Sequence, residues 1–132
     1  MKLFYKPGAC SLASHIFLRE IGHSFDIESV DTAAGRTAEG IDYRQINPKG
    51  YVPALQRDDG ANLTEGPVIL QFLWDGAPDA KLAPKIGTMA RAQMLELLTF
   101  VSRIAKRPSA QAAMRAEGLI TSRPKPTRKC PR

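Results

Sequence analysis

The sequence has few of the residues that stabilise disulfide-rich proteins or bind metals. Its 132 residues include two cysteines, Cys10 and Cys130, and two histidines. Because the cysteines lie far apart, we expect reduced thiols and a cytoplasmic protein rather than a secreted disulfide scaffold. His15 and His23 do not form a ligand pair, and no Cys-x-x-Cys motif accompanies them. We therefore expect no metal, zinc included.

Long hydrophobic runs are also lacking. Lys6 and Pro7 interrupt the apolar stretch near the N-terminus after only three residues. We therefore expect no signal or lipoprotein leader, although Ala9-Cys10 resembles a cleavage site. No later window is long enough to cross a bilayer, so no membrane partner is expected. A content of 43% hydrophobic and 24% charged residues is typical of one ordinary folded domain.

Acidic residues are absent from the C-terminal segment 119–132, "LITSRPKPTRKCPR", which holds five basic residues. This segment accounts for most of the net charge of +6, since 19 basic residues less these five leave 14, against 13 acidic ones. Nucleic-acid binding would favour aromatic residues that stack on bases, and none accompanies these basic charges. We therefore predict a solvated, disordered basic tail and no nucleic-acid partner.

The first 30 residues have the pattern of a β-α-β unit. We predict a strand over 2–5, a helix over 11–21 and a strand over 24–30, parallel to the first if the helix is a crossover. Gly22 suits a left-handed end of the helix. The apolar residues of the helix fall on one stripe: Leu12, Ala13, Ile16, Phe17 and Ile21.

The following residues predict an antiparallel half. A short irregular helix is expected over 41–46, then "VPAL" enters a strand and "RDDGANL" predicts a hairpin with Asp59-Gly60 at its turn. A helix is predicted over 64–74, with Thr64 as its cap and Glu65 near its positive end. The order β-α-β, loop, β-β-α predicts an α/β fold of thioredoxin-like type.

Cys10 lies in "FYKPGACSLASH", between a Pro-Gly-Ala turn and the first predicted helix. The unpaired backbone N–H groups and the dipole at a helix start favour a thiolate, which would make Cys10 a competent nucleophile. A structural turn cysteine explains the same position equally well. Position alone leaves both alternatives open.

Three segments together resemble a known family. "MKLFYKPGACSLASHIFLRE", "NPKGYVPAL" and "LTEGPVILQFL" resemble, in order and spacing, the glutathione-binding domain of bacterial beta-class glutathione S-transferases. The resemblance covers residues 1–80 and implies a transferase with glutathione as co-substrate and a small electrophile as second substrate. It also implies that Cys10 contacts the glutathione sulfur and that Ser11 helps to hold the thiolate, as the catalytic residues.

The other two segments supply the expected glutathione-binding residues. Val52 precedes Pro53, which is cis in thioredoxin-like folds, so that the Val52 backbone pairs with a peptide ligand. Glu65 and Gly66 open a helix, where the carboxylate can meet the ligand's ammonium and the N–H groups its α-carboxylate. Taken alone, Glu65 is equally well explained as an acid matched to the helix dipole. Many relatives have a serine after this glutamate, where this chain has Gly66. In the family a basic residue reaches the glycine end of glutathione, and Arg36 is the nearest candidate here.

After residue 85 the resemblance becomes partial. "GTMARAQMLELLTFVSRI" resembles the first helix of the family's C-terminal domain, whereas "AKRPSAQAAMRAEGL" resembles the last residues of a relative. We interpret 85–118 as a truncated all-α remnant of the helical domain, from which the intervening helices were deleted. The histidine that the family brings from this domain has no counterpart, and Lys106 is most simply a solvated lysine.

Three functions remain open. The first is a glutathione transferase or thiol exchanger, the second a non-catalytic glutathione-binding module, and the third an inactive truncated remnant. Loss of the helical wall should leave five apolar residues partly exposed and favour a homodimer or self-association. These residues are Phe72, Leu73, Trp74, Leu97 and Phe100.

Overall fold

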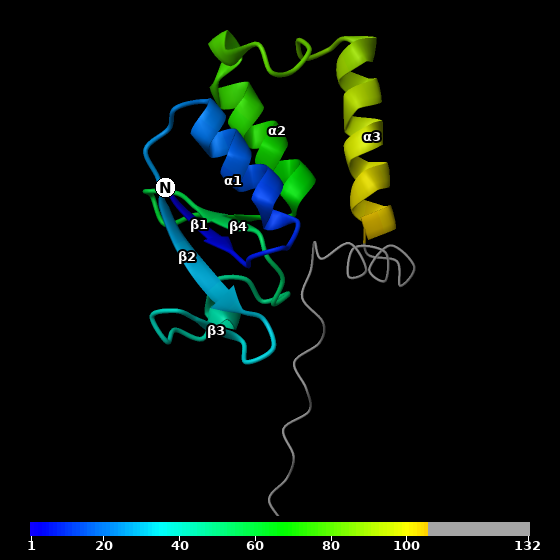
Figure 1. The fold of residues 1–132 in the computed structure, drawn as a ribbon. Helices are drawn as coiled ribbons and strands as arrows, with labels where there is room; N and C mark the ends of the chain where they lie inside the picture. Colours follow the sequence, from blue (N-terminus) through cyan, green and yellow to red (C-terminus); the bar gives the residue numbers. More distant parts are fainter. Residues whose placement is uncertain (106–132) are drawn as a thin grey trace, which may run out of the picture.

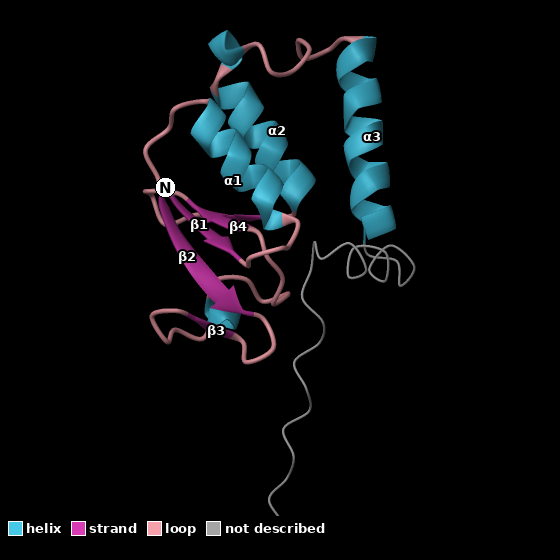
Figure 2. Ribbon diagram, in the orientation of Figure 1, coloured by secondary structure: helices cyan, strands magenta, loops and turns pink. Residues whose placement is uncertain are grey.

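A computed structural model describes residues 1–105, with side chains described as far as residue 100. The predicted tail 119–132, Lys106 and the rest of 106–118 lie outside the described residues. Figures 1 and 2 show helices α1 and α2 lying together over one face of a sheet, with α3 beside α2. The elements are β1 (Lys2–Tyr5), α1 (Ser11–Glu20), β2 (Asp26–Asp31), β3 (Arg36–Thr37), η1 (Tyr43–Gln45), β4 (Ala54–Gln56), β5 (Asn62–Thr64), α2 (Gly66–Gly76), η2 (Pro78–Ala80) and α3 (Met89–Ala105).

The five strands form one mixed sheet in the order β3-β2-β1-β4-β5. β1 pairs in parallel with β2, where Leu3 faces Ile27, and antiparallel with β4, where Leu3 faces Leu55. The β4–β5 hairpin is antiparallel, as its turn sequence predicts. This order confirms the thioredoxin-like fold. The strand β3 was not predicted, because a strand of two residues is too short to show an alternating pattern.

Side chains of the sheet alternate between two hydrophobic clusters, one on each face. Leu3 belongs to the cluster beneath the helices, and Phe4 to the cluster on the opposite face. Leu73 of α2 lies in the first cluster and is 3% exposed, so the expectation that it would be partly exposed is wrong. It packs with Leu3, Leu18 and Leu55 in this cluster. Leu12 and Ile16 of α1 are exposed, so only part of the predicted apolar stripe is buried.

The ends of the two packed helices differ in how well the sequence predicted them. Gly22 follows α1 with φ of 67°, the left-handed conformation expected there. Thr64, in contrast, does not cap α2, because it pairs with Ala54 in the β4–β5 ladder. α2 begins at Gly66, and Glu65 occupies the cap position. The cap prediction for Thr64 is therefore wrong.

Helix α3 is attached to the rest of the fold through Arg91. The Arg91 guanidinium pairs with Asp75 of α2, donates to the Pro84 carbonyl at 3.3 Å and lies 5.5 Å from the centre of the Trp74 ring. The side chain of Arg91 is nearly buried as a result. Within residues 1–105, no helix is both long enough and apolar enough to cross a membrane.

Candidate functional site at the N-termini of α1 and α2

Cys10 occupies the N-terminal cap position of α1, after the turn that follows β1. The residue is exposed, and its Sγ lies 3.3 Å from the Val52 carbonyl oxygen, to which the thiol donates. The first turn of α1 itself contains no acidic residue. The hydrogen bond to the Val52 carbonyl requires the protonated thiol, whereas the helix dipole at this position favours a thiolate.

The loop before β4 and the start of α2 meet beside Cys10. The Val52–Pro53 peptide is cis, as the resemblance implied. The pairing of Ala54 with Thr64 brings the residues before and after them, Pro53 and Glu65, next to each other. A Cβ on Gly66 would lie 3.9 Å from Cγ of Pro53, which confirms how close the two segments are. Five predicted site residues thus gather in one place: Cys10, Val52, Pro53, Glu65 and Gly66.

The Glu65 carboxylate is held by a lysine that the sequence analysis did not identify. Lys49 Nζ lies 3.0 Å from Glu65 Oε1 and 3.4 Å from the Thr64 hydroxyl. Glu65 itself has φ of 72°, a region that residues other than glycine seldom adopt. The only signal for Lys49 in the sequence was its position inside the quoted segment "NPKGYVPAL". Lysines in such turns are usually solvated.

Ser11 and Arg36 are placed differently from the other predicted residues. The Ser11 hydroxyl is buried, accepts from Lys6 N–H and donates to the Lys6 carbonyl, both at 3.2 Å. It therefore holds the turn that leads to Cys10. Arg36 lies on the edge strand β3, separated from β4 by β2 and β1, and donates to the Gly40 carbonyl at 2.9 Å. The roles of both residues towards a ligand remain predictions.

Comparison with known proteins identifies the family. The sequence model of the family "Glutathione S-transferase, N-terminal domain" matches residues 8–75, the segment that contains the gathered site residues. The chain belongs to the glutathione S-transferase family. Its sequence is 52% identical over 102 residues to glutathione S-transferase GstA of Escherichia coli O157:H7, an alignment that covers 77% of this chain and 51% of GstA.

Solved structures of bacterial members of the family share the fold. The beta-class glutathione S-transferase of Sphingomonas chungbukensis superposes with a TM-score of 0.74 at 51% identity, covering 76% of this chain and 50% of that protein. A sphingomonad glutathione S-transferase in complex with glutathione superposes with a TM-score of 0.72 at 49% identity, again over 76% of this chain and 50% of that one. This glutathione S-transferase family chain thus spans about half the length of these relatives.

Two further buried polar side chains adjoin the site and were missed by the sequence analysis. Tyr43 Oη and Asn47 Nδ2 both donate to the Tyr51 carbonyl, one residue before Val52. Burial raises the pKa of Tyr43 to about 12, although a hydrogen bond from Asn47 opposes the shift. Asn47 lies in the quoted segment "NPKGYVPAL", but the sequence does not show which carbonyl it binds.

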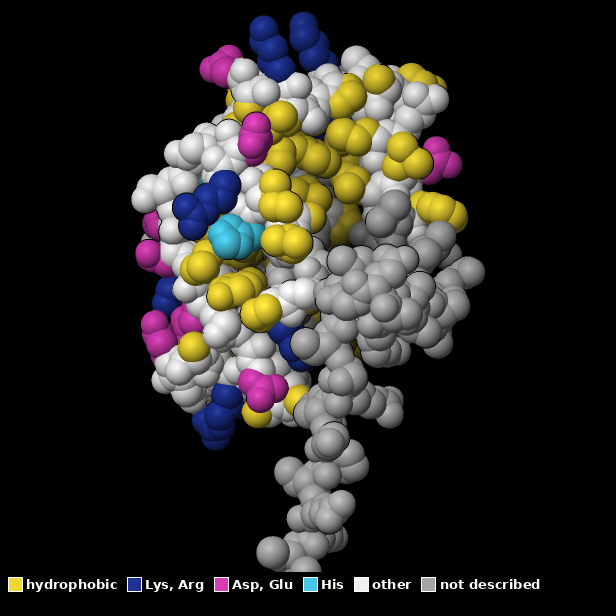
Figure 3. All heavy atoms as spheres, viewed as in Figure 1, with side chains coloured by type: hydrophobic (Ala, Val, Ile, Leu, Met, Phe, Trp, Pro, Cys, Tyr) yellow, Lys and Arg dark blue, Asp and Glu magenta, His cyan; other side chains and the backbone are white. Residues whose placement is uncertain are grey.

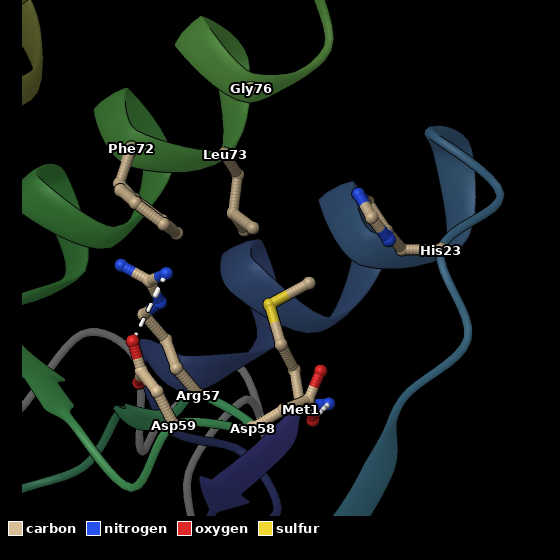
Figure 4. A pocket seen from close by; sticks show the side chains of 8 residues that line it. All are labelled: Met1, His23, Arg57, Asp58, Asp59, Phe72, Leu73 and Gly76. Carbon is tan, nitrogen blue, oxygen red and sulfur yellow. Dashed lines mark hydrogen bonds and ion pairs between the residues drawn. The ribbon is translucent and has the colours of Figure 1, made fainter.

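A separate hollow of about 400 Å³ lies beside Met1, which directly precedes β1 (Figure 4). Phe72 and Leu73 of α2 form its apolar wall, and Arg57 pairs with Asp59 at 3.2 Å on its rim. None of the predicted site residues lines this hollow. Within the part of the chain that the structure describes, no group of three or more His, Cys, Asp or Glu residues could hold a metal ion.

Proposed function

We propose that the chain binds glutathione across the N-termini of α1 and α2 and presents its sulfur for conjugation to a small electrophile or for thiol exchange. The observation that carries this proposal is the convergence of Cys10, the Val52–Pro53 peptide and the Glu65–Gly66 helix start, segments up to 56 residues apart in sequence. Glutathione bound to a structural relative supports the choice of ligand.

Each part of glutathione has a matching group in this arrangement. The Glu65 carboxylate is suited to the ligand's ammonium group, and backbone N–H groups at the start of α2 are suited to its α-carboxylate. The Val52 backbone is suited to the peptide part, which would pair with it like an added strand. Cys10 takes the sulfur, with Ser11 holding the turn, and Arg36 is proposed for the carboxylate of the glycine end.

The proposed chemistry takes one of two forms. In conjugation, the glutathione thiol loses its proton to solvent, the sulfur bonds to an electrophilic carbon, and the leaving group departs with its bonding electrons. In exchange, the Cys10 thiolate attacks one sulfur of oxidised glutathione, and a new S–S bond replaces the old one. The second glutathione then leaves as a thiolate and takes up a proton.

A second candidate is a glutathione-binding module with little conjugating activity, or an inactive remnant. Leu97 and Phe100 of α3 are 63% and 58% exposed, so these apolar side chains face outwards instead of enclosing an electrophile. Holding two reactants in place contributes about 7–11 kcal/mol to such reactions. Without that contribution conjugation would be weak even where glutathione binds.

Mass spectrometry and a conjugation assay separate these possibilities. We expect oxidised glutathione to add one glutathionyl group to the wild-type chain, located on Cys10 by peptide mapping. The matched control is Cys130→Ser, which keeps the adduct, whereas Cys10→Ser loses it. Conjugation to an aryl halide that disappears in Cys10→Ala indicates the enzyme, and an adduct without conjugation indicates the module. Absence of both adduct and glutathione binding would overturn the proposal.

A further inference from the structure

The Tyr51 carbonyl is fixed by two buried donors. Tyr43 Oη lies 2.8 Å and Asn47 Nδ2 lies 2.6 Å from this oxygen. Tyr43 is fully buried and Asn47 is 2% exposed, whereas Tyr51 itself is 70% exposed. The buried groups therefore fix the backbone of Tyr51 and leave its side chain in solvent.

This carbonyl determines the direction of the Val52 N–H group. A peptide unit is planar, and in the trans form its C=O and N–H bonds point in opposite directions. Among the described residues, the cis peptide is the one between Val52 and Pro53, so the Tyr51–Val52 unit is trans. Because its carbonyl points inwards to Tyr43 and Asn47, its N–H points to the opposite side. The next carbonyl, that of Val52, lies at Cys10.

Tyr43 and Asn47 act as one unit anchored to the sheet. Asn47 N–H donates to the Tyr43 carbonyl at 2.9 Å, and Asn47 Oδ1 accepts from Lys49 N–H at 3.1 Å. The Tyr43 ring lies 5.8 Å from the Phe4 ring of β1. The orientation of the loop before Val52 is therefore tied to the central strand of the sheet.

We propose that Tyr43 and Asn47 are positioning residues that turn the Val52 N–H towards the peptide part of glutathione. As a result, Cys10 would react faster with the disulfide of a peptide thiol such as glutathione than with the disulfide of a small thiol that has no peptide bond. This inference rests on the proposed function, since it concerns how the same site recognises its ligand. Tyr43 remains protonated, and so remains a donor, across neutral pH because burial raises its pKa to about 12.

The test compares two disulfides as substrates for exchange at Cys10. Oxidised glutathione has the peptide part, and bis(2-hydroxyethyl) disulfide lacks it. Tyr43→Phe keeps the ring and removes the donor, so we expect exchange with oxidised glutathione to slow by about three- to tenfold, the usual effect of one hydrogen bond. Exchange with the hydroxyethyl compound should change by less than about twofold, because attack at sulfur itself does not require the Val52 N–H.

Two more variants make the result specific. Asn47→Ser shortens the side chain that carries the second donor. It should also lower the rate of exchange with oxidised glutathione relative to the rate with the hydroxyethyl disulfide. Val30→Ala is the control, because Val30 is buried in the same cluster as Tyr43 but lies on β2. It should lower the melting temperature and leave the ratio unchanged.

The outcomes also separate this inference from the proposed function. Equal slowing with both disulfides in Tyr43→Phe, or an equal change of ratio in Val30→Ala, would overturn the positioning role. A wild-type chain that reacts with the hydroxyethyl disulfide but forms no glutathione adduct would instead overturn the proposed function.

Discussion

At the scale of single residues, Glu65 shows a backbone conformation that is costly for its residue type. A non-glycine residue with φ of 72° costs on the order of 1–3 kcal/mol, and such conformations cluster at ligand sites. The conformation places a carboxylate at the start of α2, where Lys49 balances its charge at 3.0 Å. Both charged groups are partly exposed, so this ion pair contributes little to stability. We therefore expect the Glu65 carboxylate to serve ligand binding rather than folding.

Replacing Glu65 with glutamine tests this explanation. Glu65→Gln keeps the size of the side chain but removes its charge and replaces one acceptor oxygen with an NH2 donor, so we expect glutathione affinity to fall by about tenfold or more. Titration calorimetry with reduced glutathione measures the change. Glu96→Gln, on the exposed surface of α3, is the matched control. Similar losses in both variants would show that net charge, and not the Glu65 carboxylate, governs affinity.

At the scale of elements, Glu28 of β2 joins three segments on the sheet face opposite the helices. Its carboxylate accepts from Lys2 of β1 at 3.1 Å and from Glu39 N–H at 3.3 Å, and its side chain is 4% exposed. Burial opposes ionisation of Glu28, but hydrogen bonds from Thr37, Lys2 and the Glu39 backbone together lower its pKa. Ionised Glu28 therefore stabilises the pairing of β1, β2 and β3.

This arrangement predicts a stability loss in acid. The pKa of Glu28 is lower in the folded chain than in the unfolded chain, where it is about 4.3. The stabilisation is thus present above pH 4.3 and is lost as the pH falls through the lower, folded value. Urea unfolding from about pH 6 to pH 3 should show this loss in the wild type and a flatter profile in Glu28→Gln. Parallel profiles would contradict the role given to Glu28.

At the scale of the whole molecule, apolar side chains remain exposed on the helical side. Leu12 and Ile16 of α1 are 56% and 58% exposed, in addition to Leu97 and Phe100 of α3. Figure 3 shows hydrophobic side chains gathered over the helices, above the sheet. Apolar surface of this kind favours association because burying it removes it from water.

We therefore expect the chain to form dimers or larger species at micromolar concentration. The double variant Leu97→Glu and Phe100→Glu should shift it towards the monomer, as measured by light scattering after size exclusion. Ile41→Glu, a similar change on the loop after β3, should have no such effect. A monodisperse wild-type monomer that binds no hydrophobic dye would contradict the expectation.

Local sequence was enough to predict the order of strands and helices apart from β3, the hairpin at Asp59-Gly60 and the segments that carry the candidate site residues. Hydrophobic periodicity and turn chemistry depend on neighbouring residues, so they can be read without the fold. The tertiary structure decided which of the apolar positions are buried, Leu73 rather than Leu12, and where α2 begins. It also decided that Cys10 meets the Val52 carbonyl and that Tyr43 and Asn47 hold the Tyr51 carbonyl. These contacts depend on which segments the sheet brings together, and no pattern of neighbouring residues specifies the partner of a hydrogen bond between segments.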